Sequence, residues 1–167
     1  MKIIDGLLSE LEQEATTTRR VLERIPQEHL SWRPHPKSMS LGQLALHVAT
    51  VPGLVAEFAA ADVIPRPPAF VQPEAATAAE LVPTLAESVA KAKRLLGSYD
   101  DAKMAVTWRL QSDGRDLMAM PRVAVVRAIM LNHWYHHRGQ LLVYLRLLNL
   151  PVPSVYGPTA DENPFAA

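Results

Sequence analysis

Apolar residues recur every three or four positions in four stretches of the chain, and prolines lie near the ends of most of these stretches. This spacing gathers apolar side chains on one face of a helix, and no alternating strand pattern competes with it. The chain is therefore predicted to be all-α, a four-helix bundle. The four expected helices run from Asp5 to Ile25, from Ser40 through Phe58, from a start between Thr77 and Pro83 to Gly97, and from Pro121 to about Leu148.

Two of the connections between these helices are long. The proline-rich stretch from Pro65 to Pro73 cannot be helical. Residues 98–121 contain an Asp113-Gly114 turn and have room for a short extended piece around Trp108. Long crossover connections are therefore compatible with this chain, and simple up-down-up-down order is not required.

The composition restricts both the partners and the compartment. With 167 residues, 49% of them apolar, the chain suits one domain spanning residues 1–167. Seventeen basic residues balance seventeen acidic ones, so its charge favours neither nucleic acid nor a membrane surface as a partner. The absence of cysteine excludes disulfides and leaves histidine, carboxylate and water as metal ligands. Because no signal peptide or membrane-spanning run stands out, we expect a cytoplasmic protein.

The fourth expected helix carries two histidines on its apolar stripe. His133 and His137 are four residues apart, so their side chains point the same way from adjacent turns. Met130 and Leu141 share that face, and an imidazole that points into a core needs a partner for its ring nitrogens. A divalent metal such as zinc, nickel or iron is one such partner, because neutral imidazole is a good ligand for these ions.

A third ligand is available on the second expected helix. His47 lies on that helix's inner stripe between Leu44 and Val51. Two ligands from one helix and one from a facing helix match the three-histidine pattern of catalytic sites, in which water or substrate takes the open position. Pro52 follows one turn later. It cannot donate to the carbonyl of residue 48 and should bend the helix close to His47.

Other readings of these residues remain open. A His-x-x-x-His pair also occurs in ordinary packing, in which case water and carbonyl groups satisfy the ring nitrogens. His136 is turned about 100° from His137, which indicates a surface or outer-sphere position. His29 and His35 fall in a connection. Trp134 stands where a metalloprotease would carry its glutamate base, so a hydrolase lacks an obvious base.

Tyr144 follows His137 by seven residues and shares its face. Its hydroxyl is a candidate catalytic donor to substrate or to bound water, and a half-buried core tyrosine is the alternative. Arg138 is suited to hold the C-terminal tail or a carboxylate, and a surface ion pair is an equal alternative. Four carboxylates approach the histidines only if the fold brings them there: Glu57, Glu87, Asp161 and Glu162.

At these residues the sequence resembles the DinB/YfiT-like family over nearly its whole length. The resemblance rests on Ser31-Trp32-Arg33-Pro34, on Ser40-Leu41-Gly42-Gln43-Leu44 with His47, on His133-Trp134-Tyr135-His136-His137-Arg138-Gly139-Gln140, and on the tail from Pro151 to Asp161 with Val155-Tyr156-Gly157-Pro158. Pro52 departs from the expected pattern. The resemblance implies a four-helix bundle in up-down-down-up order, a metal at His47, His133 and His137, and frequent homodimers.

Three functions compete at this point. The first is a divalent-metal-dependent enzyme that adds or transfers a low-molecular-weight thiol to a small-molecule electrophile, as the resemblance implies for some relatives; a metal-dependent hydrolase is its variant. The second is a non-catalytic metal-binding or stress-response protein. The third is a bundle without a metal. Zinc or nickel is the expected ion, with iron or manganese as alternatives.

Overall fold

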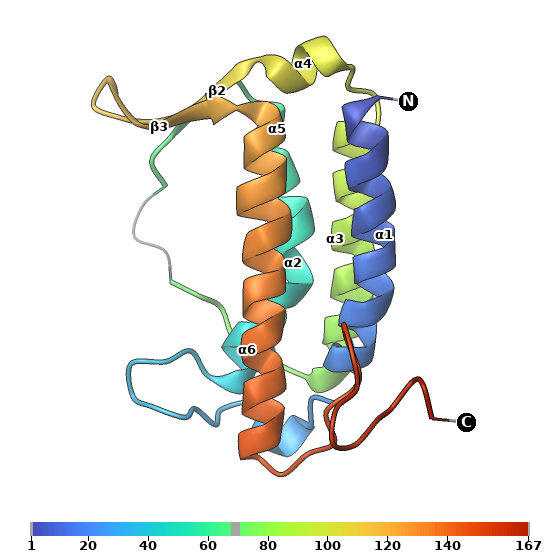
Figure 1. Cartoon of the computed structure of the whole chain (residues 1–167). Helices are drawn as coiled ribbons and strands as arrows, with labels where there is room; N and C mark the ends of the chain where they lie inside the picture. The colour runs from blue at the N-terminus through green and yellow to red at the C-terminus, as the bar shows by residue number, and fades with distance from the viewer. Residues whose placement is uncertain (1, 68–70, 167) are drawn as a thin grey trace.

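Four long helical segments lie side by side in the computed structural model, which describes residues 2–67 and 71–166 (Figure 1). The last segment is a continuous rod, here called the C-terminal rod, and its middle part is π-helical. The segments are α1 (Ile3–Leu22), α2 (Leu41–Ala60), α3 (Leu81–Leu96) and the C-terminal rod, made of α5 (Arg122–Ala124), the π-helix Val125–Asn132 and α6 (His133–Leu147). Short 3-10 turns cover Gln27–His29 and Ala78–Glu80.

A small sheet corrects the all-α prediction. It contains β1 (Val63–Pro65), β2 (Thr107–Ser112) and β3 (Arg115–Pro121) in the order β1-β2-β3, and a short helix, α4 (Asp101–Ala105), precedes it. The hairpin turns at Asp113 and Gly114, whose φ angles of 51° and 75° suit a tight hairpin loop. The expected extended piece around Trp108 is therefore the central strand. Of the proline-rich stretch from Pro65 to Pro73, residues 68–70 lie outside the described residues, and the rest is not helical.

The ends of α2 and α3 follow the sequence signals. Ser40 accepts a hydrogen bond from the Gln43 backbone at 3.1 Å, and the Gln43 side chain accepts one from the Ser40 backbone at 2.9 Å, which completes the capping box. Gly97 caps α3 as expected. By length and composition α2 is apolar enough to cross a membrane, but 56% of its apolar window is buried inside the bundle, as in a core helix.

Pro52 leaves a backbone acceptor in α2 that another helix uses. Because proline has no N–H, it cannot donate to the carbonyl of Val48 one turn earlier. The indole Nε1 of Trp134, a fully buried side chain on α6, donates to that carbonyl at 2.8 Å. Trp134 of α6 therefore donates to the one carbonyl of α2 that Pro52 leaves without an intrahelical donor.

The other side of α2 packs closely on α3 at the next residue. The N–H of Gly53 donates to Ser88 Oγ at 2.8 Å, and Ser88 Oγ donates to the carbonyl of Thr50 at 3.0 Å. A Cβ atom at Gly53 would lie 3.0 Å from the Ser88 carbonyl oxygen, so any other residue would push the two helix backbones apart by a few tenths of an ångström.

Two buried arginines attach the C-terminal rod to the rest of the chain. Arg122 is fully buried and donates to the carbonyls of Ala59 at 2.6 Å and Lys103 at 2.7 Å. Arg138, 1% exposed, pairs with Glu14 at 2.6 Å and donates to the Tyr156 hydroxyl at 2.6 Å. Arg138 thus binds both a carboxylate of α1 and the C-terminal tail, and the surface ion pair is excluded.

Trp134→Phe should destabilise the protein by about 1–3 kcal/mol, because it leaves the buried Val48 carbonyl without a donor. The Pro52→Ala substitution restores a backbone N–H at position 52, which can then donate to Val48. In that background the cost of Trp134→Phe should be smaller by about 1 kcal/mol or more. Urea unfolding of the four proteins of this double-mutant cycle measures the difference. Additive effects would contradict the proposed link between the two residues.

Candidate metal centre

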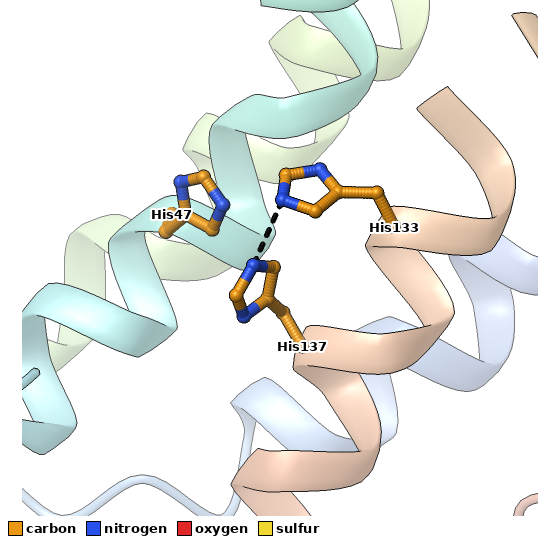
Figure 2. Close-up of side chains that lie close together, drawn as sticks. All are labelled: His47, His133 and His137. Atoms are coloured by element: carbon orange, nitrogen blue, oxygen red, sulfur yellow. Dashed lines mark hydrogen bonds between the residues drawn. The ribbon is translucent and has the colours of Figure 1, made fainter. Parts of the chain in front are cut away.

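Three histidines meet between α2 and α6, as Figure 2 shows. The Nε2 atoms of His133 and His137 are 2.8 Å apart. The ring centroid of His47 lies 5.2 Å from the ring centroid of His133 and 4.5 Å from that of His137. One ring nitrogen from each residue falls within 4.8 Å of the other two. Metal–nitrogen bonds of about 2.0–2.1 Å in a tetrahedral site separate the ligand nitrogens by roughly 3.3 Å. The cluster therefore has the size of a three-histidine site.

The histidines lie at the edge of the buried face of α6. The most buried side chains of that helix are Trp134, Arg138, Leu141 and Leu145, whereas His133 and His137 are half-buried, as is His47 on α2. The sequence prediction placed the pair on the apolar stripe, pointing into the core; the structure instead places both residues beside the most buried positions of the helix. Half-burial leaves part of each of the three histidines exposed to solvent.

His133 stands where the π-helix ends. Its backbone N–H donates to the carbonyl of Ala128, five residues earlier, in place of the Ile129 carbonyl that a regular α-helix would use. Its ring Nδ1 is buried and has no hydrogen-bond partner among the described residues. A buried ring nitrogen without a partner is costly, so His133 is only partly satisfied by the protein.

The contact between the Nε2 atoms of His133 and His137 tests whether the cluster suits a metal ion. In the free protein, the contact between the two Nε2 atoms requires one of them to donate and the other to accept. If both Nε2 atoms bound an ion, both would offer lone pairs to it, and neither would have to donate to the other. A divalent ion would thus take the place of a hydrogen bond that only one proton arrangement of the two rings allows, and the three neutral imidazoles fit such an ion.

The surroundings keep all three rings neutral. Burial, followed by the neighbouring His137 and His133 rings, lowers the pKa of His47 from 6.5 to about 4. Burial is also the main cause that lowers the pKa of His133 and that of His137, and it outweighs the opposing effects of the Ile129 carbonyl and the Gln140 side chain. Neutral imidazole is the form that binds a metal, so the site is prepared for a cation near neutral pH.

The other candidate residues lie around this cluster. His136 is exposed, with its ring centroid 5.0 Å from that of His137, and is outside the group of three. The hydroxyl of Tyr144 donates to the Met39 carbonyl at 3.2 Å, and its ring meets the edge of Trp32. Tyr144 therefore holds the segment before α2 in place, and its catalytic role stays a prediction.

The four carboxylates considered from the sequence lie elsewhere. Glu57 pairs with Lys91 at 2.7 Å, and Glu87 lines a groove between α2 and α3. Asp161 pairs with Arg146, and the backbone N–H groups of Val152 and Ser154 donate to Asp161 and Glu162 at 2.9 and 3.0 Å. Within the described residues, the histidine cluster contains no carboxylate ligand.

Sequence reasoning overlooked Gln140. Its Oε1 lies 2.7 Å from Nδ1 of His137, on the ring's far side from His133. The i, i+3 spacing of the two residues on one helix was a usable signal, because such residues are neighbours on the helix surface.

The helical fold and the cluster of three histidines from two helices place this chain among helical proteins with a candidate metal site. The chain belongs to the DinB family, whose sequence model matches residues 2–164. It is 28% identical over 168 residues to the uncharacterized protein YrdA of Bacillus subtilis strain 168, covering 95% of this chain and 91% of that protein.

Solved structures agree on the fold. A DinB-like protein from Bacillus cereus ATCC 10987 superposes with a TM-score of 0.72 at 24% identity, over 92% of this chain and 97% of that one. The DinB-like protein YjoA from Bacillus subtilis gives 0.67 at 20% identity, over 90% and 97%. A member of the DinB family from Exiguobacterium sibiricum 255-15 gives 0.60 at 22% identity, over 94% and 95%.

The metal-free protein should lose stability as the pH falls from about 6.5 towards about 4. Above pH 6.5, His47 is neutral in both states; below it, the unfolded chain takes up a proton that the folded protein refuses until about pH 4. Urea unfolding of chelator-treated protein at several pH values measures this, with His47→Gln as the comparison. The variant should lose less stability over the same range, and an equal loss would contradict the assigned cause.

Proposed function

We propose that the protein is a divalent-metal-dependent enzyme that adds or transfers a low-molecular-weight thiol to a small electrophile. The observation that carries the proposal is the cluster of three neutral ring nitrogens within 4.8 Å. His47, His133 and His137 would hold the ion. Zinc or nickel suits an all-imidazole site, and iron or manganese is the alternative.

The chemistry follows from three protein ligands and an open position. His47, His133 and His137 would hold an ion that supplies Lewis-acid chemistry, which would lower the pKa of a bound thiol so that its thiolate forms near neutral pH. The thiol proton leaves to solvent, and the sulfur lone pair forms the bond to the electrophilic carbon. In a transfer reaction the displaced electron pair goes with the leaving group; in an addition it goes to a neighbouring atom, which then takes up a proton.

The protein's own residues suit this reaction better than hydrolysis. No carboxylate base joins the histidines in the described part of the chain, and Trp134 fills the position of such a base. Thiol chemistry needs little help from a protein base once the thiol is ionised. Hydrolysis by a metal-activated water stays the catalytic alternative, because such a water also needs less help from a base.

A non-catalytic metal-binding or stress-response protein is the second candidate. A purely structural site would be closed by four protein ligands. The described cluster offers three, and all three are half-buried. This favours a site that exchanges its fourth ligand.

Purified protein should bind about one zinc or nickel ion per chain, and the ion should raise the melting temperature. His133→Ala and His47→Ala should each abolish tight binding, because two ligands hold the ion poorly. His136→Ala is the matched control and should retain nearly all the metal. Elemental analysis and calorimetry measure both. Loss of metal in His136→Ala with retention in His133→Ala would sink the assignment.

A screen of small thiols against electrophiles should show metal-dependent consumption of one thiol. The His133→Ala variant should be inactive. The wild-type protein should lose its activity on chelation and regain it when zinc or nickel is added back. Tyr144→Phe should keep the metal; a loss of activity in that variant would indicate a role toward substrate, and full activity would indicate packing alone. No metal-dependent turnover with any thiol, together with stoichiometric metal, would favour the non-catalytic candidate.

The remaining proposals concern assembly. The long connections support up-down-down-up order for the four long helices, and the family resemblance supports a homodimer that leaves the histidine face free. The neutral net charge supports the absence of nucleic-acid and membrane partners and is compatible with a cytoplasmic location. Light scattering at micromolar concentration tests the dimer, and a monomer mass would exclude it.

A further inference from the structure

Gln140 is placed to control one ligand of the site. It follows His137 by three residues on α6, and its Oε1 lies 2.7 Å from Nδ1 of that ring. The side chain is half-buried at the edge of the same helix face. The other nitrogen of the His137 ring, Nε2, faces His133 at 2.8 Å.

An amide oxygen can only accept a hydrogen bond, so Nδ1 of His137 must carry the proton in this contact. The neutral ring then has its lone pair on Nε2, the atom that faces the cluster. The contact also fixes the rotation of the ring, because both of its nitrogens have directed partners.

The neighbouring histidine has no comparable partner. Nδ1 of His133 is buried without a hydrogen-bond partner among the described residues, so its tautomer is set only by the contact of its Nε2 with His137. The two histidines of α6 therefore differ: His137 is fixed in advance, and His133 adapts to it.

We propose that Gln140 is a positioning residue that fixes the tautomer and orientation of His137 for metal binding. This inference rests on the proposed metal site. Gln140 does not touch the ion; it acts through the ring of His137. Groups that hydrogen-bond the far nitrogen of a metal-binding histidine typically contribute 10- to 100-fold to metal affinity.

The tautomer can be read without metal. Long-range 1H–15N spectra of the chelator-treated protein distinguish Nδ1–H from Nε2–H, and comparison with His137→Ala assigns the ring. The wild-type protein should show the Nδ1–H form at His137. In Gln140→Leu, His137 should lose its preference for that form. An Nε2–H form in the wild-type protein would overturn the proposal.

Zinc affinity supplies the second measurement, by competition with a chromophoric chelator. Gln140→Leu should bind zinc about 10- to 100-fold more weakly. Gln140→Glu should bind within about threefold of the wild-type protein or more tightly, because a carboxylate also accepts from Nδ1–H. Gln13→Leu, at an exposed position on α1, is the matched control and should change nothing.

The outcomes separate this inference from the proposed function. Wild-type zinc affinity in Gln140→Leu would overturn the positioning role while leaving the metal site intact. Equal weakening in Gln140→Leu and Gln140→Glu would also overturn it, because it would indicate a structural role for the glutamine. A wild-type protein that shows Nδ1–H at His137 but binds no zinc would refute the metal site and, with it, the positioning role.

Discussion

The hydrogen bond from Trp134 to the Val48 carbonyl is the interaction on which the site depends. It uses the carbonyl to which Pro52, lacking an N–H, cannot donate. Val48 is next to His47 in α2, and Trp134 lies between His133 and His137 in α6. This one buried hydrogen bond therefore satisfies the free carbonyl of α2 and joins α2 to α6 at the level of the three histidines. Pro52 is in this way part of how the cluster is assembled.

The site also depends on partial burial. Deeper burial of the three histidines would separate their ring nitrogens from solvent. Full exposure would let the rings take up protons near pH 6.5, because burial is what lowers their pKa. The histidines of the C-terminal rod are only partly buried because the side chains that attach the rod to the core lie on a neighbouring face of the same helix. Trp134, Arg138 and Leu141 take the buried positions, and the histidines beside them are half-buried.

The helices and the meeting of the three histidines could be predicted, because both follow from helical periodicity. The sheet could not: β3 is largely exposed and shows no alternation, and β1 has three residues that pair with β2 more than 40 positions away, Val63 with Arg109. The lost bond at Pro52 was foreseen, but its replacement came from a distant helix. The role of Arg138 could not be predicted either, because its partners on α1 and in the C-terminal tail become its neighbours only in the folded chain.

The strength of the helix packing bears on whether an ion here would be structural or functional. A structural ion is most valuable where few other contacts join its ligands' elements. Here α2 and α6 are already joined by the Trp134 bond and by a shared core that contains Leu44, Val48 and Leu141. The helices therefore have little need of a metal to hold them together. Three histidines that are neutral, half-buried and held by the surrounding packing therefore fit the proposed exchangeable ion better than one that only cross-links the fold.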